Sequence, residues 1–394
     1  MDSSSRHEDY MRRALAEGKK GLGRTSPNPA VGAVIVRDGA IIGRGFHKKA
    51  GTPHAEVNAL ANARAHGHDL RGATMYVTLE PCNHSGRTPP CTEAILAAGI
   101  RQVYIGTKDP NAQVAGGGAA FLAARGVEVH LDICRSACRQ LIVPFAKHSR
   151  SGMPWVLMKA GMSLDGKITH TQGQSGTITG PEAAVYVHGL RNELDAILIG
   201  VGTALIDNPS LTTRLADHSG RDPVRLVLDS TLRLSPDCQM LRQQSTSSTW
   251  IFCREDADLA REARLQEAGA RVIRIGARAS GDPHLDLQQI MRYLGGQGIA
   301  SVLVEGGAQV HASFLAEDLV DEVALLLAPY FIGEAGTPLL QGRGPCQVGN
   351  RDGNSGAGGH HFKKLSKICA EHLGADLLYR GYFTDPDSLF PAAP

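Results

Sequence analysis

The stretch from His54 to Cys91 constrains this chain more than any other feature, because it gathers metal-binding and proton-transfer side chains in a fixed order. His54 and Glu56 open it, Cys82 follows, and Cys91 closes it. Two thiolates and one imidazole fill three positions of a tetrahedral zinc ion and leave the fourth open to water. The sequence therefore predicts a catalytic zinc site with the ligands His54, Cys82 and Cys91. Glu56, close to the metal but not bound to it, is the predicted acid–base residue.

The order of these residues favours hydrolytic deamination, in which zinc acidifies a water molecule and a glutamate carries protons. The spacing is unusual, because zinc deaminases of nucleobases generally place two residues between their cysteine ligands. Here Cys82 and Cys91 enclose eight residues. A histidine at the start of a helix is more often structural, and the alternative interpretation is a pair of buried free thiols. The four residues together, in this order, favour the metal site.

Length and composition exclude several classes of protein. A chain of 394 residues is too long for one ordinary core, so two domains are expected. Its 41 basic and 39 acidic residues leave a net charge of +2 without a long basic run, which argues against a nucleic-acid partner. Eight scattered cysteines do not resemble a disulfide framework and fit a reducing cytoplasm. The polar N-terminus and the lack of an apolar run near ~20 residues predict neither a signal peptide nor a membrane partner.

The N-terminal half alternates short apolar runs with amphipathic stretches, as in a layered α/β fold. Strands are expected at 31–36, 41–46, 73–79, 102–106 and 127–131. Helices are expected at 10–20, 54–66, 92–98, 119–124 and 134–147. The third strand would deliver Cys82, and Cys91 would open a helix whose dipole stabilises a thiolate. We expect a sheet with helices on both faces.

A polar connector at 148–153 is predicted to separate a domain at 1–147 from a second domain at 154–383. Strand runs in the second domain fall at 196–200, 224–228, 250–253, 271–275, 301–304 and 322–327, with helices at 256–268 and 285–294. This alternation again predicts an α/β fold. The glycine- and asparagine-rich segment 342–361 is expected to be a loop, and the proline-rich tail at 384–394 is not expected to pack.

A nucleotide-binding turn is expected late in the second domain. The pair Gly200 and Gly202 fails the dinucleotide fingerprint, because Leu205 takes the place of its third glycine. Gly306-Gly307 instead lies between a β-rich run and an apolar helix, and the N–H groups at the start of a helix bind phosphate. A Gly-Gly pair in such a place is often only a turn, so this pattern alone leaves both interpretations open.

Motifs in the first half are similar to those of one known family. They are Thr25-Ser26-Pro27-Asn28-Pro29, Val31-Gly32-Ala33-Val34, Gly45-Phe46-His47, His54-Ala55-Glu56-Val57 and the run from Glu80 to Cys91. They resemble the deaminase half of the bifunctional riboflavin-biosynthesis deaminase/reductase, which uses the wide cysteine spacing. The resemblance implies a cytidine-deaminase-like α/β/α sandwich that deaminates 2,5-diamino-6-ribosylamino-pyrimidinone 5′-phosphate. The substrate-binding residues that it implies are Asn28, His47, His84 and Arg87.

The second half resembles the reductase half of the same family, on motifs at 159–166, 202–209, 211–214, 229–230 and 305–307. The resemblance implies an α/β fold similar to dihydrofolate reductase, NADPH as the cofactor, and a homo-oligomer. The implied cofactor-binding residues are Gly161, Thr177, Thr203, Asp207, Ser230, Gly307, Ala308, Gln309, Val310, His311, Ala312 and Ser313. The implied residues for the second substrate are Lys159, Ser175, Arg191, Leu211, Arg214 and Glu305.

The implied second reaction moves a hydride from NADPH to C1′ of an opened ribosylamine and leaves a ribityl chain. Arg191 and Arg214 suit a phosphate, because a guanidinium group forms two parallel hydrogen bonds with it. Without the motif, a surface ion pair explains either arginine equally well. Lys159 and Glu305 are polar partners for the imine and hydroxyls, and either could move the proton.

Two other functions fit part of the sequence. The first is a nucleic-acid or free-nucleotide deaminase with an unrelated second domain, which the balanced charge and the cysteine spacing disfavour. The second is a non-catalytic zinc-binding scaffold, which the presence of Glu56 disfavours.

Overall fold

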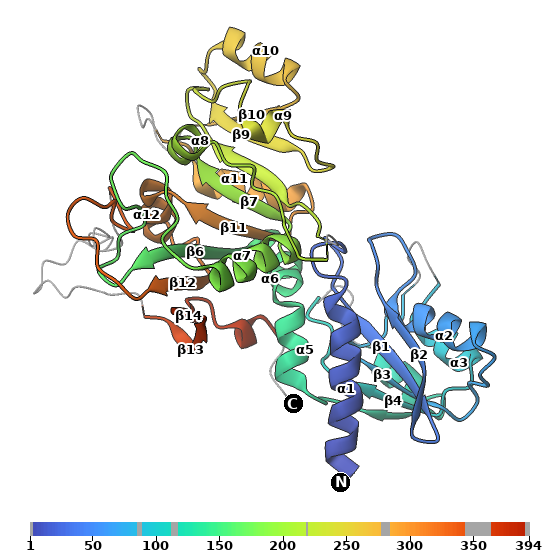
Figure 1. The fold of residues 1–394 in the computed structure, drawn as a ribbon. Coiled ribbons are helices and arrows are strands. Elements are labelled where there is room, and N and C mark those ends of the chain that lie inside the picture. The colour runs from blue at the N-terminus through green and yellow to red at the C-terminus, as the bar shows by residue number, and fades with distance from the viewer. Residues whose placement is uncertain are drawn as a thin grey trace, which may run out of the picture. The chain divides into compact units, whose positions relative to one another are not determined.

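The computed structural model describes residues 3–84, 89–111, 117–217, 220–276, 284–342 and 364–390. The chain divides into two compact units, Met1–Gly152 with Pro386–Pro394, and Met153–Asp385 (Figure 1). None of the helices in these ranges has the length and apolar character needed to cross a membrane.

The first unit is built on a five-stranded mixed sheet in the order β2-β1-β3-β4-β5. Its elements are α1 (Ser3–Lys19), β1 (Gly32–Arg37), β2 (Ala40–Phe46), α2 (Ala55–Ala65), β3 (Thr74–Val77), α3 (Cys91–Ala97), β4 (Gln102–Ile105), α4 (Gly118–Ala123), β5 (Glu128–His130), α5 (Arg135–Leu141), α6 (Val143–Ser151) and the 3₁₀ helix η2 (Pro386–Leu389). Strand β1 pairs antiparallel with both β2 and β3, whereas β3, β4 and β5 run parallel to one another. The parallel strands therefore end at a common edge, where Cys82 follows β3.

Helices cover both faces of this sheet, as predicted (Figure 1). Glycines bring two of them unusually close. A Cβ on Gly32 of β1 would lie 2.0 Å from the carbonyl oxygen of Ala14 in α1. A Cβ on Gly45 of β2 would lie 2.3 Å from the backbone nitrogen of Ala59 in α2. Gly32 pairs with the neighbour of Gly45, so the two glycines point to opposite faces, and α1 and α2 pack on opposite sides.

The second unit contains a nine-stranded sheet in the order β10-β9-β8-β7-β11-β6-β12-β14-β13. Its elements are β6 (Trp155–Ser163), α7 (Pro181–Glu193), β7 (Ala196–Gly200), α8 (Val201–Asp207), β8 (Val224–Leu228), α9 (Gln239–Arg242), β9 (Thr249–Arg254), α10 (Leu259–Glu267), β10 (Arg271–Ile275), α11 (Leu287–Gly296), β11 (Ser301–Gly306), α12 (Ala308–Ala316), β12 (Glu322–Ala328), β13 (Ser366–Leu373) and β14 (Asp376–Tyr382). The seven strands from β10 to β12 in this order are parallel, and β14 and β13 form an antiparallel hairpin at one edge.

The parallel strands are buried on both faces. In β7, Ile197 and Ile199 pack into a core shared with α7, α8 and α10. The alternate residue Leu198 packs into a second core with α11 and α12. A parallel sheet needs cover on both sides, so these strands consist of almost uninterrupted apolar residues. The predicted α/β layers are confirmed.

The units divide between Gly152 and Met153, within the connector expected at 148–153, but the helices around this point differ from the predicted ones. A single helix was expected at 134–147, but the structure has two: α5 ends at Leu141, and α6 begins at Val143. Pro144, in the first turn of α6, cannot donate a backbone hydrogen bond to continue α5. Helix α6 then runs to Ser151, so most of the expected linker at 148–153 is helical.

The prediction that the tail does not pack is wrong for residues 386–390. These residues form η2, and Phe390 is only 5% exposed within the core of the first unit. The guanidinium of Arg139 lies over the Phe390 ring at 4.9 Å and pairs with Asp387 at 3.1 Å. Proline content suggested a loose tail, but one buried aromatic ring is enough to fix a short segment.

Replacing Phe390 with alanine should destabilise the first unit by about 3 kcal/mol, because it empties a buried aromatic site. The Ser388→Ala variant, changed at an exposed side chain of the same turn, is the control and should unfold like the parent. Calorimetry measures the unfolding transitions of both units. Both tryptophans, Trp155 and Trp250, lie in the second unit, so fluorescence identifies which transition belongs to that unit. A first-unit transition that Phe390→Ala leaves unchanged would show that the tail does not contribute.

Candidate active sites

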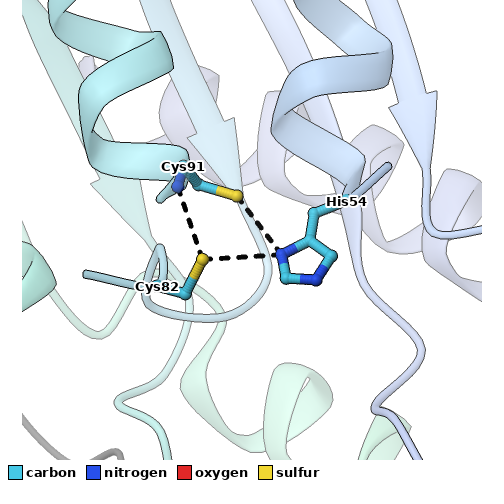
Figure 2. A group of neighbouring side chains, drawn as sticks. All are labelled: His54, Cys82 and Cys91. Atoms are coloured by element: carbon cyan, nitrogen blue, oxygen red, sulfur yellow. Dashed lines mark hydrogen bonds between the residues drawn. The ribbon is translucent and has the colours of Figure 1, made fainter. Parts of the chain in front are cut away.

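Three side chains from separate elements meet beside the start of α2 (Figure 2). His54 precedes that helix, Cys82 lies beyond the end of β3, and Cys91 is the first residue of α3. The Nδ1 atom of His54 lies 3.5 Å from the sulfur of Cys82 and 3.3 Å from the sulfur of Cys91. The backbone N–H of Cys91 donates to the Cys82 sulfur at 3.4 Å. The structure thus brings together all three predicted ligands.

The donor set fits zinc. A tetrahedral ion with bonds of ~2.3 Å to sulfur and ~2.0 Å to nitrogen holds such donors about 3.5 Å apart. The three donor atoms lie within 4.8 Å of one another. A hydrogen bond from the Cys91 thiol, helped by His54, lowers the pKa of Cys82 to about 4, and the same contact raises the pKa of Cys91. One thiolate therefore forms readily, and metal binding favours the second.

Glu56 lies in the first turn of α2, and its side chain is only 3% exposed. Burial raises the pKa of Glu56 to about 6. The carboxyl group also lies within hydrogen-bonding reach of the Cys91 sulfur, beside the metal donors. A carboxyl that exchanges its proton near neutral pH is suited to carry one between a nucleophilic water and a leaving group.

His54, Cys82 and Glu56 line a cavity of about 460 Å³ in the first unit. The predicted substrate residues Asn28, His47 and His84 line it, whereas Arg87 lies outside the described residues. Asp109, Asn111 and Phe145 also line the cavity and were not predicted as site residues. The Asp109-Pro110-Asn111 motif after β4 was a usable signal for two of them, but nothing in the sequence indicated Phe145.

His47 fixes the orientation of Asn28. The His47 ring is 2% exposed and lies edge-on to the His54 ring, with the centroids 5.2 Å apart. Its Nδ1 atom is 3.2 Å from the carbonyl oxygen of Pro53, so this nitrogen carries the proton and donates. Nε2 can then accept from the Asn28 amide at 3.3 Å. Burial lowers the pKa of His47, which keeps the ring neutral and leaves the Asn28 side-chain oxygen available as an acceptor.

A second cluster lies in the middle of the nine-stranded sheet. Met158 of β6 pairs with Val304 of β11, and Lys159 and Glu305 are the next residue on each of these parallel strands. Their side chains therefore point to the same face, and Lys159 Nζ lies 3.4 Å from Glu305 Oε2. The same face is covered by α7, the helix that carries Arg191.

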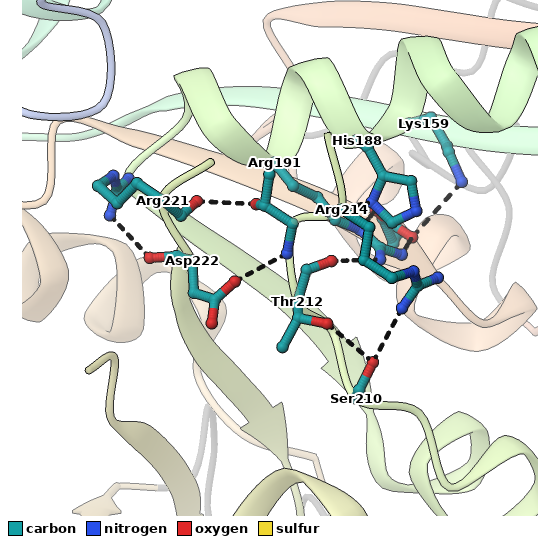
Figure 3. Close-up of polar contacts among 10 residues, drawn as sticks. Lys159, His188, Arg191, Ser210, Thr212, Arg214, Arg221 and Asp222 are labelled. Carbon is teal, nitrogen blue, oxygen red and sulfur yellow. Dashed lines mark hydrogen bonds and ion pairs between the residues drawn. The ribbon is translucent and has the colours of Figure 1, made fainter. Parts of the chain in front are cut away.

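Arg191 donates two hydrogen bonds to Glu305, from Nε at 2.8 Å and from Nη2 at 2.9 Å. It donates a third, from Nη1, to the carbonyl oxygen of Thr212 (Figure 3). Burial alone would raise the pKa of Glu305, but the charges of Lys159 and Arg191 lower it to about 2. The carboxylate therefore stays ionised. Arg191, predicted to hold a phosphate, is occupied by this carboxylate in the structure.

Several predicted cofactor residues collect at the carboxyl edge of the parallel strands. Thr203 follows β7, Ser230 follows β8, and Gly307 follows β11. Helix α12 begins directly after Gly307, and a Cβ there would lie 2.9 Å from the Thr203 hydroxyl. A glycine at the start of a helix, at the carboxyl edge of a parallel sheet, is a suitable cradle for a dinucleotide pyrophosphate.

The other predicted residues of this site fall into two groups. Gly161 lies in β6 near Thr179, and Ala308, His311 and Ala312 face the interior of the unit. Burial lowers the pKa of His311 to about 4, so this ring is neutral. The more accessible residues are Ser175, Thr177, Asp207, Gln309, Val310, Ser313 and Arg214, whereas Leu211 is buried. Only the accessible group can touch a ligand through side chains without rearrangement.

Comparison with known proteins covers both units. Residues 154–376 match the family model of the RibD C-terminal domain, and residues 4–107 match the cytidine and deoxycytidylate deaminase zinc-binding region. The riboflavin biosynthesis protein RibD of Actinobacillus pleuropneumoniae is 42% identical over 372 residues, which cover 94% of this chain and 93% of that protein. This chain belongs to the RibD family.

Other RibD proteins match over the same span. The Escherichia coli protein is 38% identical over 381 residues, covering 94% of this chain and 97% of the relative. The crystal structure of a diaminohydroxyphosphoribosylaminopyrimidine deaminase/5-amino-6-(5-phosphoribosylamino)uracil reductase from Thermotoga maritima has a TM-score of 0.79 and 35% identity, covering 96% of this chain and 99% of that one. The chain is thus a bifunctional deaminase and reductase of riboflavin biosynthesis. An unrelated second domain, the alternative considered from the sequence, is excluded.

Replacing Arg191 with methionine should destabilise the second unit of this RibD chain at pH 7 by about 3 kcal/mol, because Glu305 loses its closest counter-ion in a buried site. Lys159 and Arg191 together hold the folded pKa of Glu305 at about 2, below its ordinary value of 4.5, against the opposing effect of burial. Their stabilising effect is therefore present above pH 4.5 and disappears as the pH falls toward 2. The difference between variant and parent should therefore shrink in acid.

Urea unfolding followed by tryptophan fluorescence, at several pH values, measures this difference. Arg242→Met is the control, since Arg242 and Asp237 form an ion pair in which both side chains are about two-thirds exposed, and it should unfold like the parent. An Arg191→Met deficit that stays constant from pH 7 to pH 3 would contradict the electrostatic explanation.

Proposed function

We propose that this RibD chain carries out two consecutive reactions. The first removes the C2 amine of 2,5-diamino-6-ribosylamino-4(3H)-pyrimidinone 5′-phosphate. The second reduces the ribosyl group of the product, 5-amino-6-(5-phosphoribosylamino)uracil, to a ribityl chain. The observation that carries the proposal is the convergence of His54, Cys82 and Cys91 beside buried Glu56, in a chain whose second unit matches the RibD C-terminal domain. His54, Cys82 and Glu56 line one cavity.

The first unit supplies the residues for hydrolytic deamination. His54, Cys82 and Cys91 would hold a zinc ion with one open position. When bound, zinc supplies an acidified water, of pKa about 7, as the nucleophile. Glu56 would take a proton from the attacking water as its oxygen bonds to C2 of the pyrimidine, and would give that proton to the departing nitrogen. Water is consumed, and a carbonyl and ammonia are formed.

The rest of the cavity would bind the pyrimidine and its phosphoribosyl group. Asn28, held by His47, offers an amide oxygen to a ring N–H or an exocyclic amine. His84 lines the cavity, and Arg87 follows it in sequence, which suits a contact with the phosphate. Asp109 also lines the cavity, where burial raises its pKa, and it can accept a hydrogen bond from an amine of the substrate.

The second unit would bind a nicotinamide cofactor along the carboxyl edge of its parallel strands. The start of α12 at Gly307 suits the pyrophosphate, with Thr203 and Ser230 on the neighbouring strand ends. When bound, a reduced nicotinamide supplies the hydride. We propose NADPH on the basis of family membership. The thiol ligands of the first site favour a reducing compartment such as the cytoplasm, and a homo-oligomer stays a prediction.

Lys159 and Glu305 would act on the ribosylamine. Glu305 is held ionised by its two cationic neighbours, so it is suited to accept hydrogen bonds from sugar hydroxyls and not to donate a proton. Lys159 is the cation next to it and can place a proton on the ring-opening oxygen or on the amine nitrogen. The charge balance of the cluster supports this division of the roles that the sequence left open.

The Glu56→Gln variant tests the proposed function. Glutamine keeps the size of the side chain but cannot carry a proton, so ammonia release should fall by roughly 10²–10⁴-fold while zinc content and reduction of supplied deaminated substrate are retained. Glu17→Gln, at another buried glutamate of the first unit, is the matched control and should keep both activities. A Glu56→Gln protein that still releases ammonia at the parent rate, or one that also loses the reduction, would be inconsistent with two separate sites.

A further inference from the structure

Helix α7 holds the segment from Ser210 to Arg214 at two points (Figure 3). Arg191, in its last turn, donates to the carbonyl oxygen of Thr212 at 3.2 Å. His188, one turn earlier on the same helix, accepts from the backbone N–H of Arg214 through Nδ1, also at 3.2 Å. Residues three apart on a helix share a face, so the two contacts act together.

The contact requires a neutral His188. Because Nδ1 accepts, the ring proton must be on Nε2, and a doubly protonated ring could not accept at all. In the described part of the chain, the charged groups that act on the ring are the cations Arg191 and Arg214 and the anion Glu305. Burial, followed by the two arginines, lowers the pKa of His188, against a smaller opposing effect of Glu305 and of the Thr212 backbone.

The segment that His188 holds carries a guanidinium group without a counter-ion. Arg191 is occupied by Glu305, whereas no ion pair involves Arg214 in the described part of the chain. The Arg214 side chain is exposed, and its Nη1 atom donates to the Ser210 hydroxyl at 3.2 Å. The Ser210 hydroxyl lies 3.1 Å from the Thr212 hydroxyl. Together they present one free guanidinium and two hydroxyls, a set suited to a phosphate monoester.

We propose that His188 is a positioning residue of the reductase, which as a neutral imidazole fixes the backbone of Arg214 so that its guanidinium meets the 5′-phosphate of the second substrate. The proposal rests on the proposed function and adds a residue to it. Phosphate affinity is thereby coupled to the protonation of His188: acid removes the acceptor and releases the Arg214 segment. His188 itself does not touch the reacting atoms.

Three substitutions separate this role from a general structural one. In His188→Asn the side-chain oxygen can take the place of Nδ1, whereas His188→Gln places its oxygen nearer to Nε2, and His188→Ala offers no acceptor. At pH 8 the Asn variant should keep the parent KM for 5-amino-6-(5-phosphoribosylamino)uracil within about twofold. Loss of one hydrogen bond should raise KM by roughly 2–12-fold in the Gln and Ala variants, with kcat nearly unchanged.

Two further readouts complete the test. KM of the parent should rise more steeply than that of His188→Asn from pH 8 to pH 5.5, since both share the titration of the substrate phosphate and only the parent has the imidazole. The same substrate without its phosphate should show no difference among the variants.

The inference would be overturned by an Ala variant with the parent KM, an Asn variant as weak as Ala, a parent-to-Asn KM ratio independent of pH, or an equal KM defect with the phosphate-free substrate. Failure of the parent enzyme to reduce the substrate would instead overturn the proposed function.

Discussion

One imidazole nitrogen and two sulfurs must come within bonding distance of a single ion, and the fold of the first unit is arranged to allow this. His54 can reach Cys82 only if α2 packs closely on the sheet, and Gly45 permits that approach because any Cβ there would meet the backbone of Ala59. Cys91 reaches the same point because α3 starts with it. Two ligands lie at helix starts, and the third, Cys82, lies in the segment after β3, where the backbone N–H of Cys91 donates to its sulfur.

The second unit contains a buried carboxylate that stays ionised. Glu305 is surrounded by a sheet and a helix and would be neutral if burial alone acted on it. Lys159 and Arg191 keep Glu305 ionised. Because both cations contact this carboxylate, they are less available to bind other anions. The cations nearest the carboxylate are therefore paired within the protein. The phosphate is proposed to bind Arg214, which has no acidic partner among the described residues.

Much of this could be predicted from the sequence. The strands β7, β8 and β10 begin and end at the predicted residues, because runs rich in β-branched and other apolar residues are typical of buried parallel strands. The run is unbroken in β7, whereas arginines lie within β8 and β10. The order of His54, Glu56, Cys82 and Cys91 predicted the metal cluster before any distance was known. Local sequence patterns do not predict the structure of a segment that is held by a single tertiary contact, as Phe390 holds the tail. His188 and Phe145 were missed because only the folded chain brings them to their sites.

X-ray absorption at the zinc edge of the full-length protein tests the central claim most directly, because it reports the atoms bound to the metal. We expect one equivalent of zinc with two sulfur neighbours at ~2.3 Å and two nitrogen or oxygen neighbours at ~2.0–2.1 Å, from one imidazole and one water. Substituting serine for Cys91 should remove one sulfur from this shell. A shell without sulfur, or protein that carries no stoichiometric zinc, would contradict the assignment of the first site.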